Sequence, residues 1–221
     1  MQKILVVSVH PDDETLGCAG TLLRLRSQGA QISWLILTQM GKDKFSKETI
    51  EGRSKEIQVV SKIYGMNDVK VLRFETTNLV QVPLNDLVQE ISEVVNQLQP
   101  DTVFIPNRSD AHSDHRRAFE ALSVLVKGFR YPYIKNVLMY ETISETEFAP
   151  ALPEKIFIPN MFVEVTHFIQ KKIEIMRIYS SELGQHPFPR SERNILALAT
   201  FRGATANVEY AESFMVLKFQ I

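Results

Sequence analysis

The sequence predicts an α/β fold built on a doubly wound, mainly parallel sheet with helices on both of its faces. Short apolar runs without polar alternation recur along the chain, which is the pattern of parallel strands buried on both faces. Segments with apolar residues at helical spacing separate these runs. Each of these segments is long enough for the right-handed crossover that joins two parallel strands of one sheet.

Strands and helices alternate over the first part of the chain. The predicted strands cover 4–7, 31–38, 69–74, 102–105 and 136–140. The predicted helices cover 16–28, 47–64, 84–98 and 114–127. Gly29, Gly65 and Gly128 follow three of these helices, at the position where glycine is the preferred residue for ending a helix. In the doubly wound strand order 3-2-1-4, the first and fourth strands are neighbours.

The final third of the chain has a less regular pattern. We expect an interrupted strand, a helix, a rigid proline-rich loop, a second helix, and then either a last strand or an irregular tail. These elements cover 155–165, 166–179, 185–190, 191–202 and 212–219, in that order. Thr166 or a nearby residue is the expected cap of the first of these helices, because threonine side chains accept hydrogen bonds from free N–H groups at helix starts.

The composition is that of an ordinary globular protein, organised as one domain over residues 1–221. Hydrophobic residues make up 44% and charged residues 23% of the chain, which gives ample core for one α/β domain. The formal net charge of -1 gives no electrostatic footprint for nucleic acid or an anionic membrane. The single cysteine, Cys18, excludes an internal disulfide. With no leader pattern and no apolar run of bilayer length, the expected location is the cytoplasm.

Two loops that follow buried strands carry concentrations of imidazole and carboxylate groups. The segment His10-Pro11-Asp12-Asp13-Glu14 follows the first strand, and its proline cannot continue a strand ladder, so the chain leaves the sheet there. The segment 107–115 (NRSDAHSDH) follows the fourth strand. We expect both loops to meet at the carboxyl ends of strands one and four, where open α/β sheets bind ligands. The active site is expected there.

Two imidazoles and one carboxylate form a common ligand set for a catalytic divalent metal with open coordination positions. His10 and Asp13 of the first loop and His115 of the second loop are the candidate ligands. Asp12 lies off the metal in this arrangement, yet close enough to take a proton from the attacking water.

His112 and Asp114 are the remaining candidate catalytic residues of the second loop. His112 lies about one helical turn before His115, from where its ring can donate a hydrogen bond to a developing oxyanion. Asp114 can orient His112 and raise its pKa. Two structural roles compete with these: His112 as a solvent-exposed loop residue, and Asp114 as the N-cap of the helix that starts there.

Motifs of several other enzyme classes are absent from the sequence. There is no G-x-G-x-x-G after the first strand and no G-x-x-x-x-G-K-[ST], so neither a dinucleotide site nor a P-loop is indicated. There is also no G-x-S-x-G, the nucleophile elbow of α/β-hydrolases. Cys18 lies among small residues without a neighbouring charge that would activate its thiol, so we expect a small core residue of the first helix.

The pair of loops resembles the LmbE/PIG-L family of zinc-dependent N-deacetylases. The resemblance rests on Val9-His10-Pro11-Asp12-Asp13-Glu14 together with His112-Ser113-Asp114-His115, and further on Arg53 with Glu56, on Tyr140-Glu141 and on 210–214 (YAESF). Members of this family remove acetyl groups from N-acetylglucosamine units, and they include enzymes of mycothiol and bacillithiol synthesis.

This resemblance implies a Rossmann-like fold and Zn²⁺ as the metal, and the ligand set also suits another divalent metal such as Fe²⁺. It assigns the roles to the same residues as the chemical argument above. His10, Asp13 and His115 are the metal ligands, Asp12 is the base, and His112 is the oxyanion stabiliser. It also matches Arg53 to a family arginine that contacts the substrate, a role that the pattern of this sequence alone does not single out. The implied partner is a small N-acetylated amino sugar, and a homo-oligomer is compatible with the family.

Three functions of different classes remain to be separated. The leading hypothesis is a metal-dependent amidase that acts on an N-acetylated amino sugar, free or within a small conjugate. A non-haem Fe(II) oxygenase uses the same two-histidine, one-carboxylate triad, but its usual β-rich scaffold does not fit a chain of alternating strands and helices. A catalytically idle sugar-binding or metal-binding module needs no free base, so Asp12 beside the candidate ligands argues against it.

Overall fold

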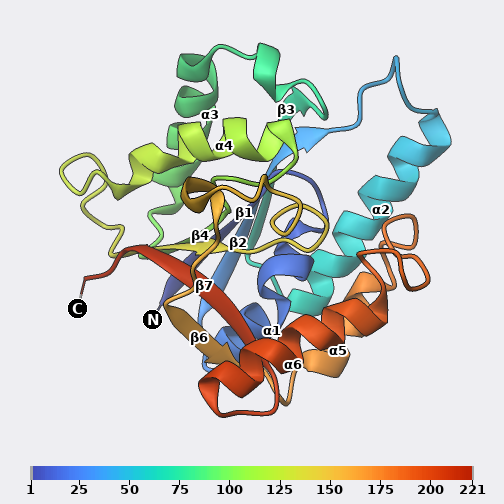
Figure 1. Ribbon diagram of the computed structural model, residues 1–221. Coiled ribbons are helices and arrows are strands. Elements are labelled where there is room, and N and C mark those ends of the chain that lie inside the picture. Colours follow the sequence, from blue (N-terminus) through green and yellow to red (C-terminus); the bar gives the residue numbers. More distant parts are fainter. Residues whose placement is uncertain (1, 221) are drawn as a thin grey trace.

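The computed structural model describes residues 2–220, and Figure 1 gives the arrangement of their helices and strands. A seven-stranded sheet in the order β3-β2-β1-β4-β5-β7-β6 runs through these residues. Its strands are β1 (Lys3–Ser8), β2 (Gln31–Gln39), β3 (Asp68–Glu75), β4 (Thr102–Pro106), β5 (Asn136–Tyr140), β6 (Met161–Glu164) and β7 (Ala211–Lys218). Strands β1 to β5 pair in parallel, and β7 is antiparallel to both β5 and β6. The predicted order 3-2-1-4 and the mainly parallel sheet are confirmed.

Helices pack on both faces of this sheet, as predicted. They are α1 (Asp13–Ser27), α2 (Lys47–Tyr64), α3 (Leu84–Leu98), α4 (Ser113–Leu122), α5 (Ile169–Met176) and α6 (Glu192–Ala206), with short 3₁₀ turns η1 (Leu79–Gln81), η2 (Ser123–Val126) and η3 (Pro153–Lys155). Alternate residues of β1 belong to opposite cores: Ile4 and Val6 pack with α1, α2, α5 and α6, whereas Leu5 and Val7 pack with α3 and α4. Figure 1 shows α3 and α4 on one side of the sheet and α1, α5 and α6 on the other.

Helix α4 is shorter than the helix predicted over 114–127. It ends at Leu122 and continues as the 3₁₀ turn η2. At this point the hydroxyl of Ser123 donates a hydrogen bond to a carbonyl of the preceding turn at 2.8 Å. A serine hydroxyl bonded in this way competes with the regular backbone ladder. Gly128 therefore lies beyond the helix and does not cap it.

The final third of the chain corrects two further expectations. Of the interrupted strand expected over 155–165, only Met161–Glu164 is a strand. Helix α5 starts later than expected, with Phe168 as its N-cap and no side-chain cap bond. Thr166 is not the cap, because its hydroxyl instead accepts a hydrogen bond from the backbone N–H of Tyr210 at 3.4 Å. The last segment is a strand, β7, rather than an irregular tail.

Helix α1 is bent at Cys18, whose φ of -148° interrupts the helix. Beyond the bend, the buried Glu212 of β7 accepts hydrogen bonds from the N–H groups of Gly20 (3.0 Å) and Thr21 (2.7 Å). The buried Lys172 of α5 donates to Glu212 and to a carbonyl before the bend, both at 2.8 Å. A buried ion pair thus satisfies backbone groups that the bend leaves without helical partners. It also ties the final third of the chain to the helix that follows the first loop.

Cys18 is fully buried in this arrangement, as expected of a small core residue. None of the helices in residues 2–220 has the length and apolar character needed to cross a membrane.

Candidate metal centre and active-site cleft

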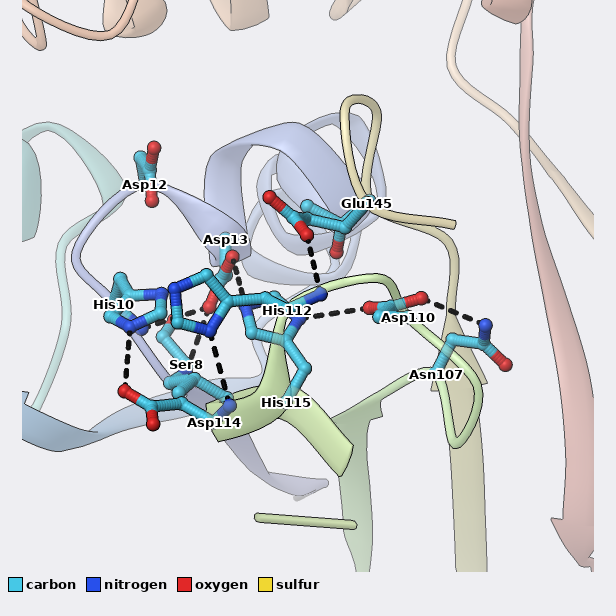
Figure 2. A network of polar contacts seen from close by, with 12 residues as sticks. Ser8, His10, Asp12, Asp13, Asn107, Asp110, His112, Asp114, His115 and Glu145 are labelled. Carbon is cyan, nitrogen blue, oxygen red and sulfur yellow. Dashed lines mark hydrogen bonds and ion pairs between the residues drawn. The ribbon is translucent and has the colours of Figure 1, made fainter. Parts of the chain in front are cut away.

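The loops after β1 and β4 meet at the carboxyl ends of these strands. The two strands are paired neighbours in the sheet, and Figure 2 shows the side chains of both loops gathered at one place. The ring centroids of His10 and His112 are 4.6 Å apart, and those of His10 and His115 are 5.3 Å apart. Three imidazoles from two separate loops therefore share one site, as the strand order predicts.

The three predicted metal ligands lie together. His10, Asp13 and His115 each offer one ligand atom, and these atoms lie within 4.8 Å of one another. Asp13 Oδ2 accepts hydrogen bonds from the backbone N–H groups of Val9 (2.8 Å) and His10 (2.9 Å), which fixes the carboxylate. Its other oxygen, Oδ1, lies 3.4 Å from His115 Nε2. Two imidazoles and a carboxylate held in this way fit a divalent metal with open coordination positions.

A second trio of His10, His112 and Asp114 also brings three ligand atoms within 4.8 Å. The carboxylate of Asp114 is already engaged, however, because its two oxygens accept the backbone N–H groups of Thr77 (2.6 Å) and Leu79 (3.1 Å). In the first trio, Asp13 keeps one oxygen without a backbone donor. The first trio is therefore the better metal site.

The carboxylate of Asp114 contacts His10 rather than the ring of His112. Its Oδ2 lies 3.4 Å from His10 Nε2. A carboxylate beside one ring nitrogen favours the tautomer with the proton on that nitrogen. This contact therefore leaves Nδ1 of His10 as the nitrogen suited to a metal. The expectation that the Asp114 carboxylate orients His112 directly is corrected: it orients His10.

His112 is the N-cap residue of α4, because its Nδ1 accepts a hydrogen bond from the backbone N–H of Asp114 at 3.1 Å. The alternative in which Asp114 caps this helix is wrong. Burial, followed by the charges of His10 and His115, lowers the pKa of His112 to about 4, although the charge of Asp114 acts in the predicted, opposite direction. The ring is consequently neutral near pH 7, and with Nδ1 accepting, its proton resides on Nε2.

Asp110 orients His115 by contacting the ring nitrogen that does not face the candidate metal site, a role that we did not expect from the sequence. Its Oδ2 lies 2.8 Å from His115 Nδ1, and its Oδ1 accepts hydrogen bonds from Asn107 (2.8 Å) and Thr146 (2.7 Å). This partner puts the Nδ1 proton of His115 against Asp110 and leaves Nε2 for a metal. Burial opposes protonation of His115, but the charge of Asp13 and the hydrogen bond and charge of Asp110 outweigh it and raise its pKa to about 9.

Asp12 is buried next to the candidate metal ligands but belongs to neither trio. Its φ of 142° is a backbone conformation that residues with side chains rarely adopt. The carboxylate of Glu14 supports this conformation by accepting the N–H of Asp12 at 3.1 Å. Burial, followed by the charges of Asp13 and Glu182, raises the pKa of Asp12 well above its usual value. The Arg190 guanidinium, 3.4 Å from Asp12 Oδ2, acts in the opposite direction.

Glu14 is a fully buried carboxyl group behind the site. It accepts hydrogen bonds from the hydroxyl groups of Thr15 (2.6 Å), Tyr179 (3.0 Å) and Ser8 (3.2 Å). Burial raises the pKa of Glu14 to about 7, against the opposing effect of the Thr15 and Tyr179 hydrogen bonds. Because Tyr179 comes from the segment that follows α5, Glu14 connects the first loop to the final third of the chain.

Arg53 of α2 lines the same cleft as the three histidines. Its guanidinium donates to the carbonyl of Pro11 at 3.2 Å and pairs with Glu182 at 2.5 Å and with Glu56 at 3.3 Å. Arg53 therefore also holds the first loop against α2.

The cleft has a volume of about 620 Å³ and opens over the three histidines and Asp12. Glu145, Glu182 and Arg190 also line it, and Glu145 accepts the backbone N–H of His112 at 2.8 Å. These three residues lie far along the chain from both motifs, so the sequence carried no signal for them. Asp110 did have a signal, because it lies in the second His/Asp loop itself.

The family of the chain follows from a comparison with known sequences. A model of the PIG-L family, described as GlcNAc-PI de-N-acetylase, matches residues 5–126, which is more than half of the chain. The chain belongs to the PIG-L family. Both loops of the site lie inside the matched region. The cluster of His10, Asp13 and His115 therefore gives this PIG-L chain a site that fits a divalent metal.

Similar proteins extend the comparison over almost the whole chain. Diacetylchitobiose deacetylase of Thermococcus kodakarensis is 25% identical over 96% of this chain and 82% of its own length. The probable N-acetyl-alpha-D-glucosaminyl L-malate deacetylase 2 of Bacillus anthracis is 26% identical over 82% of this chain and 81% of its own. The crystal structure of the conserved protein TT1542 from Thermus thermophilus has a TM-score of 0.77 and 27% identity, over 100% of this chain and 97% of that one. Relatives of this PIG-L chain thus include deacetylases of N-acetylated sugar compounds.

Proposed function

We propose that this chain is a metal-dependent hydrolase that removes the N-acetyl group from an N-acetylated amino sugar, free or within a small conjugate. The observation that carries the proposal is the set of donor atoms of His10, Asp13 and His115 within 4.8 Å of one another, with Asp12 beside them. The reaction consumes one water and one amide, and it releases acetate and the free amine. Membership of the PIG-L family and relatives named as sugar deacetylases support it.

Zn²⁺ is the metal we propose for this site, with another divalent metal such as Fe²⁺ as the alternative. His115 would hold it through Nε2, since Nδ1 faces Asp110, and Asp13 through Oδ1, since Oδ2 accepts two backbone N–H groups. His10 is the third ligand. When bound, a divalent metal supplies Lewis acidity, which polarises the amide carbonyl and makes the attacking water more acidic.

Asp12 is the proposed general base. Its carboxylate takes a proton from the attacking water and returns a proton to the leaving amine. It must begin the cycle ionised although burial opposes this, and two features favour the ionised form: the Arg190 guanidinium 3.4 Å away and the charge that a metal brings to the neighbouring ligands.

His112 is the proposed oxyanion stabiliser, and Asp114 is its supporting residue. The Nδ1 of His112 accepts the Asp114 N–H, so the neutral ring has its proton on Nε2 and can donate it as a hydrogen bond to the developing oxyanion. Asp114 supports the site twice, through its backbone N–H at His112 and through its carboxylate at His10.

Arg53 is the proposed substrate-binding residue, in accord with its place on the cleft wall.

We further propose that residues 1–221 form one domain, which the two hydrophobic cores on either side of one continuous sheet support. We also propose that the protein works in the cytoplasm on a small molecule, not on nucleic acid or membrane. A single cysteine fits a reducing compartment.

Acetate release tests the proposed function. The purified protein, loaded with Zn²⁺ and confirmed to hold about one metal per chain, is assayed on N-acetylglucosamine, its methyl glycoside and N,N'-diacetylchitobiose. We expect acetate from at least one compound and no acetate after chelation. Binding of these compounds without acetate release would identify an idle binding module. Oxygen consumption by the Fe²⁺ form that depends on the added compound, with incorporation of oxygen into it, would identify the oxygenase alternative.

A further inference from the structure

The cleft extends from the metal centre along helix α2. Apolar side chains from three elements form much of its wall in this direction: the loop before α2, α2 itself and the edge strand β3. They are Met40, Phe45, Ile50, Ile57 and Val71, and the polar side chains of Gln39, Ser54, Gln58 and Thr76 line the cleft as well. Figure 1 shows the N-terminal half of α2 at the right of the molecule, projecting past the edge of the sheet. The apolar wall therefore lies on one side of an open cleft and is continuous with the site.

Most of this wall is not part of the hydrophobic core. Phe45 and Ile50 are half-buried, Val71 is 43% exposed, and all three belong to neither core cluster. Ile57 lines the cleft and also packs against the core, and Val60 lies fully inside it. The apolar face of α2 is thus divided between the core and the cleft. When a ligand removes the apolar side chains of a cleft from water, the free energy of the complex falls, so such a ligand binds more tightly.

The charged groups of the same cleft are paired among themselves. Arg53 and Arg190 are the lysine or arginine side chains that line it within residues 2–220, and both contact Glu182, at 2.5 Å and 3.2 Å. Arg53 also pairs with Glu56 at 3.3 Å and Arg190 with Asp12 at 3.4 Å. An anionic group entering here would have to displace these carboxylates from their partners and lie beside them. Both effects are unfavourable.

We propose that the part of the cleft along α2 binds the aglycone of the substrate, and that this aglycone is uncharged and apolar. The proposal rests on the proposed function, since it assigns the substituent that the amino sugar carries. The acetamido group lies at the metal centre, and the apolar chain lies against Phe45, Ile50 and Val71. The cleft volume of about 620 Å³ is within the range of sites for ligands larger than one sugar unit.

A panel of four substrates tests this assignment in the Zn²⁺-loaded protein. They are the methyl, hexyl and carboxypentyl β-glycosides of N-acetylglucosamine, and N,N'-diacetylchitobiose. We expect kcat/KM for the hexyl glycoside to exceed that for the methyl glycoside by roughly tenfold or more, because several CH₂ groups leave water. The carboxypentyl glycoside has a chain of the same length with a charged end, and it should lose this advantage.

Other outcomes overturn the proposal. Equal kcat/KM for the methyl and hexyl glycosides would show that the apolar wall binds no aglycone, although acetate release would still support the deacetylase function. A preference for the carboxypentyl glycoside would indicate an anionic aglycone. A preference for diacetylchitobiose over the hexyl glycoside would indicate a polar, neutral one. Absence of acetate from every substrate would overturn the proposed function itself.

A matched pair of variants locates the effect on α2. Ile50→Gln puts a polar side chain on the cleft wall, and it should reduce the ratio of hexyl to methyl kcat/KM severalfold. Val59→Gln makes a similar change on the same helix, at a side chain that is 45% exposed and does not line the cleft. This control should keep the parent ratio. A ratio that stays unchanged in Ile50→Gln, or that falls equally in both variants, contradicts the assignment of the aglycone to this wall.

Discussion

The Nδ1 atom of His112 accepts a hydrogen bond from the backbone N–H of Asp114, at the first turn of α4. An imidazole that caps a helix N-terminus is held in its neutral form, because the N–H groups there carry partial positive charge. The two neighbouring imidazoles, His10 and His115, act in the same direction. His112 can therefore stabilise an oxyanion as a neutral donor through Nε2, without becoming an imidazolium.

This relationship predicts how His112→Ala changes the pH profile. With a pKa of about 4, the ring stays neutral across the range of a neutral-pH assay, and raising the pH does not remove a proton from it. We expect His112→Ala to lower kcat by on the order of a hundredfold and to leave the basic limb of kcat/KM against pH where it is. His167→Ala, at an exposed histidine, is the control. A basic limb that disappears in His112→Ala would show that His112 acts as an imidazolium.

Metal binding should be coupled to release of a proton from His115. Its pKa of about 9 in the metal-free chain means that the ring is protonated near pH 7, and a metal must displace that proton. Apparent metal affinity is therefore expected to rise with pH until about pH 9 and to level off above it. Calorimetry in buffers of different ionisation heat measures the proton count, which we expect to be about one per metal at pH 7. Affinity that does not change over this range would contradict the assignment.

Asp110 should strengthen metal binding although it is not a ligand. Its carboxylate faces His115 Nδ1 at 2.8 Å, which fixes the ring and increases the basicity of Nε2. We expect Asp110→Asn to weaken Zn²⁺ affinity by about tenfold to a hundredfold, measured by competition with a chelator. Asp101→Asn, at a carboxylate near the opposite end of the sheet that accepts the N–H of Lys3, should leave the affinity unchanged.

Asp12 and Asp13 are adjacent in sequence but should differ in function. Asp12→Ala is expected to keep metal content near that of the parent and to lower turnover by about a hundredfold or more, through loss of a positioned base. Asp13→Ala is expected to lose both metal and turnover, because its carboxylate is in the ligand trio. Elemental analysis and acetate release measure the two properties. Equal metal content in the two variants would refute this division of roles.

The ion pair of Lys172 with Glu212 should stabilise the fold. Both side chains are nearly fully buried, so Lys172→Met leaves a buried carboxylate without its cation and should lower the free energy of unfolding by about 3 kcal/mol. The neighbouring Lys171 pairs with Glu174 at the surface, and Lys171→Met should change the free energy of unfolding far less, because water screens an exposed pair. Urea denaturation of both variants gives the comparison. Similar losses in the two would show that burial of the pair is not the cause.

The sequence by itself determined the order of the first four strands and the convergence of the two His/Asp loops. These follow from local patterns, because apolar runs and helical stripes define the elements, and right-handed crossovers leave few topologies for a chain of alternating strands and helices. The residue types of His10, Asp13 and His115 then indicated a metal site once their strands were neighbours. Each step required only the composition of short segments and their order along the chain.

The tertiary structure alone decided which partner each of these side chains has. Asp110 and Asp114 flank His112 in the same loop, yet one carboxylate faces His115 and the other faces His10. The position of the Asp114 carboxylate depends on the N–H groups of 77 and 79, which lie in the segment between β3 and α3 that the pattern around the histidines does not indicate. The pattern around the two motifs also does not indicate two partners from the final third of the chain. These are Arg190, which contacts Asp12, and Tyr179, which donates a hydrogen bond to Glu14. Hydrogen bonds and ion pairs act over a few ångströms in space, so contacts between distant segments leave no period or spacing in the sequence.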